Sequence, residues 1–506
     1  MTWPRQAGIL LHPSSLPGPH GMGDLGPEAR RFADWLERAG IGIWQVLPLN
    51  PAGGTNGCNP YVSWSPLAGN PLLLSPYDLR EDGLLDELNG PRFLDERIDY
   101  PRVFAFKAER GRRAAQRLVG TPGHPLHLEW RAFRERASWA RDTGLFAALK
   151  ARHGGTPWWL WPESIRRCDS SALQSARTAL APEIDPLVAE QFLFERQWHA
   201  LRAYCRERGL RILGDVPIYL AHDSVDVWMH QDHFRLKPDG TPIAVGGAPP
   251  DVFSPVGQRW GCPVYDWAFM ARDDYAWWRA RLARALEHAD LVRLDHFRAF
   301  SAYWEIPAES PTAAGGHWVP GPGMRFFDTV RSHLEDLPFC AEDLGTTDGD
   351  LVALLRATGF PGMVILQYAF GSEANNPHLP HNHVENSIVY PGNHDNDTVL
   401  GWWNSISSDE RSRVQRYLGR HGDDIAWDLI RAALASVASV AVIQLQDILA
   451  LGSEARVNAP TSYGLPPDRQ RNWGWRMPPG ALGEFHAGRL RQLCELYGRQ
   501  GMKMGA

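Results

Sequence analysis

The sequence contains few cysteines, no long apolar run and no excess of positive charge. Its six cysteines are scattered over 506 residues and lack the close pairing that zinc and redox sites use. Nothing at the N-terminus resembles a secretory signal, so we interpret the cysteines as reduced thiols and expect no disulfide framework. No apolar stretch approaches the length of a membrane span. We therefore expect a soluble, cytoplasmic protein with no membrane partner.

The charge balance argues against nucleic acid as a partner. The formal net charge is -6 and the sequence pI is near 6.3. No lysine-rich run is present, so the sequence lacks the basic footprint of a surface that binds nucleic acid or anionic membranes. Helix-borne metal motifs such as His-Glu-x-x-His are also missing. A neutral partner fits better, and we expect neither a metal nor a cofactor.

Tryptophan, in contrast, is abundant. The chain has 22 tryptophans, several of them in clusters such as WWLW at 158–161. Aromatic faces can stack on sugar rings, but most tryptophans of a large protein fill space in its core. For any single tryptophan the core interpretation is the better one.

Strand-like apolar runs alternate with stretches of helical periodicity, for example at 28–39 and 277–288. This alternation predicts parallel β/α units, and the length suits a large barrel with insertions. We therefore predict the α/β class and a (β/α)8 (TIM) barrel with inserted subdomains around its C-terminal face. The eight candidate strands are residues 8–11, 44–47, 211–216, 291–294, 339–342, 363–367, 387–390 and 440–445.

The gap between the second and third candidate strands is far too long for a loop. It runs from about residue 50 to about residue 210 and must contain inserted structure. We predict a catalytic barrel formed by residues 1–60 and 200–506, with an inserted subdomain of residues 61–199. This subdomain is expected to cover one side of the barrel mouth.

Local patterns give the insertion some detail. Residues 72–85 resemble turns and short strands, whereas residues 103–118 and 182–208 have helical periodicity. A later stretch at 371–385 is rich in Asn, Pro and His. It predicts an irregular loop at the same end of the barrel.

Three acidic residues each follow a predicted strand, and in a barrel such strand ends meet at one mouth. Asp295 lies two residues after Arg293, so both side chains point the same way and the guanidinium can keep the carboxylate ionised. This arrangement suits a nucleophile. A purely structural Arg-Asp pair explains these two residues about equally well.

Glu342 follows the next predicted strand. Burial, or the neighbouring Asp343, would raise its pKa and keep the proton that a leaving oxygen needs. Taken alone, a capping acid in an Asp-Leu-Gly turn is the better explanation.

His394 and Asp395 follow a third strand and are suited to holding the hydroxyls of a sugar ring. Helix capping by Asn396 or Asp397 is the modest alternative, and a metal site is a weaker one. The joint occurrence of three acids at strand ends favours chemistry at an acetal carbon. Such chemistry uses a nucleophilic carboxylate, a protonated carboxyl and support for an oxocarbenium-like transition state.

Longer motifs resemble a known family. Four short motifs occur in the order found in the α-amylase clan: DVPIY at 215–219, RLDHF at 293–297, AED at 341–343 and NHDN at 393–396. Further segments resemble the 4-α-glucanotransferases (amylomaltases, disproportionating enzymes) of glycoside hydrolase family 77: GILLHPSSLP at 8–17, PPD at 249–251, GQRWG at 257–261 and GSEAR at 452–456. The resemblance covers nearly the whole chain.

The resemblance implies transfer of α-1,4-glucan segments by a retaining mechanism. Asp295 would attack the anomeric carbon and form a covalent glycosyl-enzyme, Glu342 would protonate the departing oxygen, and Asp395 would stabilise the distorted sugar. Glu342 would then activate the 4-hydroxyl of an acceptor in place of water. Retention predicts that the Asp295 and Glu342 carboxyls lie about 5 to 5.5 Å apart.

The resemblance also implies the partners and the remaining site residues. Donors would be maltooligosaccharides, amylose or other α-1,4-glucans, and glucose would serve as an acceptor. The residues implied to bind substrate are Asp215, Arg293, His296 and His394 at the donor sugar, with Tyr61, Asp251, Phe253, Trp260 and Asn458 around it.

Transfer outcompetes hydrolysis only where a covering segment shields the intermediate from water. The candidate is GGAPPDVFS at 246–254, whose glycines permit motion, although a rigid surface turn is an alternative. The chain departs from the family pattern at Val252, where a tyrosine is common, at NPYV in 59–62, and in a longer 458–471 segment. These departures leave the three acids intact.

Two other functions remain open. An α-amylase-like hydrolase would need open access of water to the site. A catalytically silent glucan-binding protein would keep aromatic surfaces without working acids, and the intact Asp295, Glu342 and Asp395 argue against it.

Overall fold

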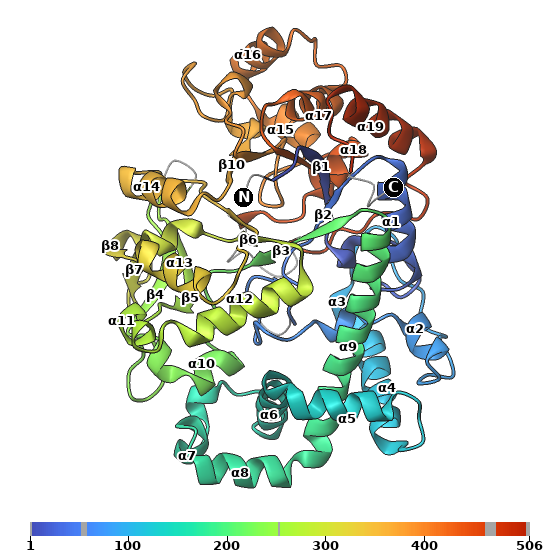
Figure 1. Ribbon diagram of the computed structural model, residues 1–506, viewed down its shortest axis with the longest axis vertical. Helices are drawn as coiled ribbons and strands as arrows, with labels where there is room; N and C mark the ends of the chain where they lie inside the picture. Colours follow the sequence, from blue (N-terminus) through green and yellow to red (C-terminus); the bar gives the residue numbers. More distant parts are fainter. Residues whose placement is uncertain (1–2, 52–57, 251–253, 461–471, 502–506) are drawn as a thin grey trace.

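A parallel eight-stranded sheet forms the centre of the computed structural model, which describes residues 3–51, 58–250, 254–460 and 472–501 (Figure 1). The strands follow one another in the order β10-β11-β12-β1-β2-β3-β6-β9. Their bounds are β1 Gln6–Leu10, β2 Ile43–Gln45, β3 Arg211–Val216, β6 Leu291–Leu294, β9 Phe339–Ala341, β10 Gly362–Ile365, β11 Ser387–Tyr390 and β12 Val440–Gln444.

The two end strands of this sheet meet, so the sheet curls into a barrel. Ala341, in β9, donates its backbone N–H to Pro361 O at 2.9 Å, just before β10. Beside this bond, Asp343 Oδ1 accepts from the backbone N–H of Met363 at 2.7 Å. The predicted (β/α)8 barrel is confirmed, and each of the eight predicted strands matches an observed one to within two residues at either end.

Successive side chains of each strand point alternately into the barrel and toward the helices, which creates two apolar cores. The inner core contains Leu10, Leu213 and Ile388, all nearly fully buried. The outer core contains residues such as Ile9 and Ile212, one position along the same strands, together with apolar faces of the surrounding helices. The sequences of these strands are therefore continuous apolar runs, because both faces of each strand are buried.

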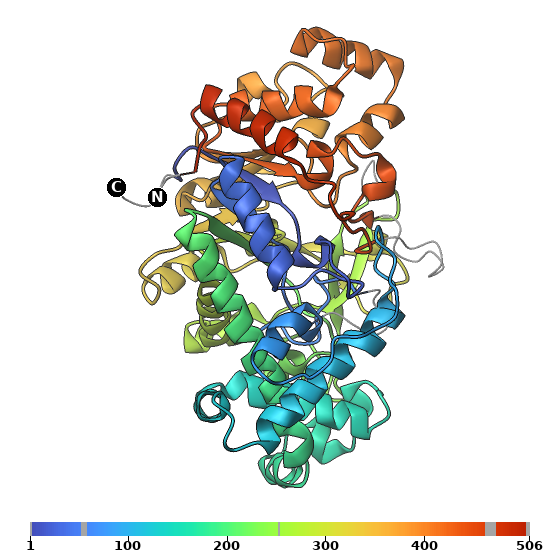
Figure 2. The same ribbon diagram turned by 90° about the vertical axis from the view of Figure 1, so that its right-hand side faces the viewer.

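Helices surround the barrel, and Figures 1 and 2 place α15–α17 and α19 at one end of the long axis of the molecule. The predicted helices at 28–39 and 277–288 are confirmed as α1 and α12. The helices outside the long insertion are α1 Pro27–Arg38, α10 Val225–Met229, α11 Trp267–Met270, α12 Ala276–His288, α13 Gly323–Arg331, α14 Gly349–Thr358, α15 Val399–Ser405, α16 Ser408–Leu418, α17 Ile425–Ala435, α18 Leu445–Ile448 and α19 Glu484–Leu496.

The chain between β2 and β3 is mainly helical and lies at the opposite end of the long axis (Figure 2). Helices predicted at 103–118 and 182–208 are confirmed, whereas the division at 61–199 stays a prediction. The helices here are α2 Pro76–Glu81, α3 Tyr100–Val103, α4 Glu109–Gly120, α5 His127–Arg136, α6 Ser138–Arg152, α7 Glu163–Arg166, α8 Ser170–Ala179 and α9 Ala181–Glu207.

The prediction of turns and short strands at 72–85 is wrong in part, because this stretch contains helix α2. Ser75 caps the helix by accepting a hydrogen bond from the backbone N–H of Asp78 at 3.2 Å. Pro76 occupies the first helical position, where its missing N–H costs nothing. The sequence signal for this helix start is the pair Ser75-Pro76, a capping residue followed by proline. The irregular loop predicted at 371–385 is confirmed, apart from the 3₁₀ turn η11 (Pro380–Asn382).

A second, antiparallel sheet was not predicted from the sequence. Its strand order is β5-β4-β7-β8, and it includes part of the segment predicted to cover the site. Gly246 and Gly247 lie in paired strand β4 and belong to the sheet rather than to a loop, and the motion expected of the segment stays a prediction. A Cβ on Gly247 would lie 2.1 Å from Gln258 O, so glycine allows β5 to approach. The strands are β4 Ala244–Ala248, β5 Gln258–Pro263, β7 Ala302–Pro307 and β8 His317–Pro320.

The six cysteines are all free, and five of them are buried. Among the described residues, none of the helices combines the length and the apolar character that crossing a membrane requires.

Candidate active site

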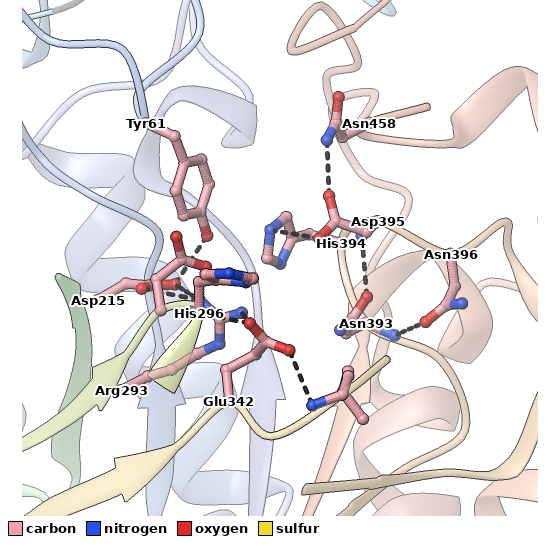
Figure 3. A network of polar contacts seen from close by, with 12 residues as sticks. Tyr61, Asp215, Arg293, His296, Glu342, Asn393, His394, Asp395, Asn396 and Asn458 are labelled. Carbon is pink, nitrogen blue, oxygen red and sulfur yellow. Dashed lines mark hydrogen bonds and ion pairs between the residues drawn. The ribbon is translucent and has the colours of Figure 1, made fainter. Parts of the chain in front are cut away.

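One arginine at the end of β6 is shared by three carboxyl groups (Figure 3). Arg293 is 1% exposed, and its Nη1 donates to both oxygens of Asp215 at 2.9 Å and to Asp295 Oδ1 at 2.9 Å. Its Nη2 lies 3.8 Å from Glu342 Oε2. The register of β3 against β6 pairs Asp215 with Arg293, and Asp295 lies two residues further along the chain. Strand pairing therefore assembles the cluster.

Backbone donors fix the side chain of Glu342. The N–H of His296 donates to Glu342 Oε2 at 2.8 Å, and the N–H of Leu344 donates to Oε1 at 3.0 Å. His296 has a φ of 45°, in the left-handed region that is uncommon for non-glycine residues. Glu342 and the exit of β6 are thus joined directly by a hydrogen bond to a strained residue.

Electrostatics favour a proton on Glu342. Burial, with a further contribution from the charge of Asp295, raises the pKa of Glu342 to about 8, although Arg293 opposes the shift. Burial raises the pKa of Asp215 to about 7, and burial lowers the pKa of His296 to about 4, so its imidazole is neutral at pH 7. One guanidinium cannot neutralise three closely spaced carboxylates. Asp215 and Asp295 accept hydrogen bonds from Arg293 at 2.9 Å, whereas Glu342 lies 3.8 Å from the guanidinium, so the proton is favoured on Glu342.

Tyr61 reaches this cluster from the start of the long insertion. Its hydroxyl donates to Asp215 Oδ2 at 2.7 Å, and burial raises its pKa well above the ordinary value. The ring stacks on His394, with centroids 5.2 Å apart and planes 8° apart. It also lies 5.8 Å from the ring of Trp473. Tyr61 therefore bridges the β3 and β11 sides of the barrel mouth.

Asp395 lies at the exit of β11 and is held by three neighbours. Asn458 Nδ2 donates to Asp395 Oδ1 at 2.6 Å, and His394 Nε2 lies 3.4 Å from Oδ2. Asn393 Oδ1 accepts from the backbone N–H of Asp395 at 2.9 Å. The carboxylate is oriented, yet 38% of the Asp395 side chain is exposed, which leaves it accessible to a ligand.

Trp260, on β5, lies beside the site. Its ring centroid is 4.8 Å from that of His296, with planes 86° apart, and 6.0 Å from that of Tyr219. The predicted site residues Asp251 and Phe253, like Val252, lie outside the described residues. The others are brought together at the barrel mouth, where Asp295 is placed by its hydrogen bond from Arg293 and Trp260 by its contact with His296: Tyr61, Asp215, Trp260, Arg293, Asp295, His296, Glu342, His394, Asp395 and Asn458.

Sequence reasoning did not select three residues that shape the site. Asn393 orients Asp395, Arg456 Nη2 donates to the carbonyl of Asp395 at 2.6 Å, and Trp473 packs against Tyr61. Asn393 and Arg456 lie inside the NHDN and GSEAR motifs, and Trp473 lies two residues before Trp475 in another of the tryptophan clusters. Among the described residues, no group of three or more His, Cys, Asp or Glu side chains is arranged to hold a metal ion.

Known proteins are similar to this chain over nearly its whole length. The family model described as 4-alpha-glucanotransferase matches residues 11–482. The chain belongs to this family. The resemblance to glycoside hydrolase family 77 is therefore confirmed, and with it the prediction that the protein is an enzyme.

Individual members cover almost the entire chain. The 4-alpha-glucanotransferase of Thermus thermophilus is 45% identical over 98% of this chain and 99% of its own length. The Arabidopsis thaliana plastid 4-alpha-glucanotransferase DPE1 is 44% identical over 98% of this chain and 86% of its own. An amylomaltase from Streptococcus agalactiae, solved in complex with acarbose, is similar in structure, with a TM-score of 0.92, 33% identity, and coverage of 98% of this chain and 100% of its own.

Proposed function

We propose that this family member moves α-1,4-glucan segments from a donor to the 4-hydroxyl of an acceptor glucan or glucose by a retaining double displacement. The observation that carries the proposal is the cluster around Arg293. An ion-paired Asp295 lies beside Glu342, whose burial raises its pKa to about 8. A retaining mechanism requires this pairing of an anionic nucleophile with a protonated acid.

In the first step Asp295 attacks the anomeric carbon of the donor sugar while Glu342 gives its proton to the departing glycosidic oxygen. The hydrogen-bonded ion pair with Arg293 orients the Asp295 carboxylate for this attack. The leaving glucan departs with a free 4-hydroxyl, and the remaining segment is esterified to Asp295. Retention requires a separation of about 5 to 5.5 Å between the two carboxyls, which stays a prediction.

In the second step Glu342, now a carboxylate, takes the proton of an acceptor 4-hydroxyl as that oxygen attacks the anomeric carbon. The ester to Asp295 breaks, Glu342 is protonated again, and the α-configuration is restored. The same carboxyl serves as acid and base because its pKa falls once Asp295 is esterified and no longer charged.

The surrounding residues bind the sugar. Asp395 and His394 are suited to gripping ring hydroxyls of a distorted donor sugar, since the Asp395 carboxylate is oriented yet partly exposed. The Tyr61 ring offers an apolar face, and Trp260 offers another beside His296, around the donor sugar. Asp251 and Phe253 complete the proposed set from the segment between β4 and β5.

The environment of the site belongs to the same proposal. The inserted residues 61–199 cover one side of the barrel mouth, and the β4–β5 connection shields the glycosyl-enzyme from water. Substrates are maltooligosaccharides, amylose or related α-1,4-glucans. The free, mostly buried thiols fit a reducing compartment, and we assign the protein to the cytoplasm.

Incubation of the purified protein with maltotriose alone tests the function. Products are resolved by chain length and free glucose is assayed over time, with Asp295→Asn in parallel as the matched control. Transfer predicts glucose together with maltooligosaccharides longer than the substrate, and their disappearance in the variant.

Other outcomes would overturn the proposal. Accumulation of only maltose and glucose would mean that water is the acceptor, as in an α-amylase-like hydrolase. Binding of maltotriose without any product would indicate a glucan-binding protein.

A further inference from the structure

Beyond His296 a second buried arginine crosses from the exit of β6 to the exit of β9. Arg298 lies in the 3₁₀ turn η8 (Phe297–Phe300), and its side chain is 5% exposed. Its Nη1 donates to Thr346 O at 2.6 Å and its Nη2 to Asp348 Oδ2 at 2.5 Å. Both acceptors belong to the segment that runs from Glu342 to helix α14. The guanidinium thus connects the two strand exits that carry the proposed nucleophile and acid.

Residues 343–348, which supply the two oxygens that accept from Arg298, are anchored at both ends of the stretch. Asp348 caps α14, because its Oδ1 accepts from the backbone N–H of Leu351 at 2.9 Å. Near the other end, Asp343 Oδ1 accepts from the backbone N–H of Met363, on the β10 side. Residues 343–348 are therefore tied to β10 by Asp343 and to β6 by Arg298. Among the residues that the structure describes, the other hydrogen bonds between this stretch and the β6 side are those of Glu342 itself.

Arg298 also contacts the antiparallel sheet. Its guanidinium carbon lies 3.9 Å from the ring centroid of Trp318, on β8. Trp318 is paired in register with Trp304 on β7, and their rings are 5.2 Å apart. This sheet carries the β4–β5 connection on its opposite edge. One side chain therefore touches the nucleophile segment, the acid segment and the sheet beside the site.

We propose that Arg298 is a positioning residue for the transfer reaction, holding the segment of Glu342 at a fixed distance and angle from Asp295. The inference rests on the proposed roles of Asp295 and Glu342. Arg298 acts through Thr346 and Asp348 rather than on the substrate. A shift of about 1 Å in a reacting group can cost about 10²-fold in rate. A side chain that fixes two strand exits against each other can therefore affect the rate strongly without contacting the sugar.

The pH profile of the reaction separates positioning from simple stabilisation. Burial is the main cause of the raised pKa of Glu342, so a loosened segment that admits water lowers this pKa. The high-pH limb of kcat/KM for donor cleavage then moves to lower pH. The charged and titratable groups that act on Glu342 are Arg293 and Asp295 from the β6 exit and Tyr368 from the turn after β10, and the backbone N–H groups of His296 and Leu344 donate to its carboxylate.

Two conservative variants carry the test. Arg298→Lys keeps the charge but loses the fork that reaches two acceptors. We expect kcat to fall about 10- to 100-fold, KM to change little, and the high-pH limb to move down. Asp348→Asn keeps the cap of α14, because Asn is an equally good N-cap, but removes the ion pair. Asp348→Asn should lower kcat and move the high-pH limb down by less than Arg298→Lys does. The double variant should lose less activity, in free-energy terms, than the sum of the two single losses.

Arg476→Lys is the matched control. Arg476 is also buried, and it donates to two backbone carbonyls, Leu94 O and Gly18 O, without joining strand exits. We expect its variant to melt at a lower temperature with an unchanged pH profile.

The positioning role is overturned if Arg298→Lys folds and keeps the wild-type kcat and pH profile. It is equally overturned if this variant, like Arg476→Lys, loses only thermal stability. Absence of transfer by the wild-type protein would instead refute the proposed function, so the two failures are distinguishable.

Discussion

Two buried arginines lie at opposite ends of the barrel and have opposite surroundings. Arg293, at the carboxyl ends of the strands, is surrounded by the carboxyls of Asp215, Asp295 and Glu342. Arg499, 0% exposed at the amino ends, donates to backbone carbonyls. Its acceptors are Leu434 O at 2.6 Å, Ser436 O and Ala438 O at 2.8 Å, Ser439 O at 3.1 Å and Gln6 O at 3.2 Å.

The difference separates function from stability. At the amino end the Arg499 guanidinium donates to backbone carbonyls of residues 434–439 and of Gln6, and it ties the residues after α19 to β1 and to the start of β12. Burial there lowers the pKa of Arg499 to about 9. At the carboxyl end, buried acids are held close together, an arrangement that favours chemistry and destabilises the fold. We expect substitutions at the carboxyl end to abolish activity and spare stability, and substitutions at the amino end to do the reverse.

The largest effect is expected for Asp295→Asn. Transfer from maltotriose should fall by about 10⁴-fold or more, as for other nucleophile deletions, while the thermal midpoint stays equal or rises because one of three crowded carboxylates around Arg293 loses its charge. Asp336→Asn, at an exposed position on the loop between α13 and β9, serves as the control with wild-type values. A parallel loss of activity and stability would erase the contrast between the two ends.

Glu342→Gln should lower donor cleavage about 10²- to 10⁴-fold and change how stability depends on pH. The folded-state pKa of Glu342, about 8, lies above its unfolded value, so the native state binds an extra proton. This group therefore stabilises the protein fully below about pH 4.5, and the contribution is lost as pH rises toward 8. Thermal midpoints measured from pH 5 to 9 should fall more steeply for the wild type than for the variant. Parallel curves would contradict the raised pKa.

Arg499→Lys should leave kcat of the folded enzyme unchanged and lower the free energy of unfolding by about 3 kcal/mol, because several buried carbonyls lose a charged donor. Denaturant titration with activity assays at a non-denaturing temperature measures both quantities. Arg5→Lys, at a less buried arginine that shares Ser436 O and Ala438 O, should give a smaller loss. A fall in kcat without loss of stability would invert the comparison.

The smallest effect is expected for Tyr61→Phe. Removing the hydroxyl deletes its 2.7 Å bond to Asp215 and should reduce kcat/KM about 10- to 100-fold, since hydrogen bonds to charged groups contribute about 1.5–3 kcal/mol. Tyr204→Phe removes a comparable 2.8 Å bond to Asp34, far from the site, and should leave kcat/KM unchanged. Equal changes of kcat/KM in the two variants would mean that the Tyr61 hydroxyl does not contribute to catalysis.

The barrel was predictable because its strands are buried on both faces and read as apolar runs. The same physics placed Asp295, Glu342 and Asp395 together, since parallel strands end at one mouth. The antiparallel sheet escaped prediction because β4 contains two consecutive glycines and most of β8 is exposed, so neither has the alternation of a half-buried strand.

Contacts through the backbone were also beyond sequence reasoning. Asn458 is placed beside Asp395 by its N–H, which donates to His394 O at 3.1 Å, and no side-chain pattern encodes such a bond. The link from Arg298 to Thr346 O has the same character. Only the resemblance pointed to Asn458, and nothing in the sequence pointed to Arg298.

The central claim, that Asp295 forms a covalent bond to the donor, can be tested by trapping. Glu342→Gln is incubated with α-maltosyl fluoride, whose leaving group needs no acid, so the ester forms and then lacks a base to resolve it. Intact-mass and peptide analysis should find a maltosyl adduct on the peptide containing Asp295, and none in a variant that also carries Asp295→Asn. An adduct on another residue, or one that persists in the double variant, would contradict the account.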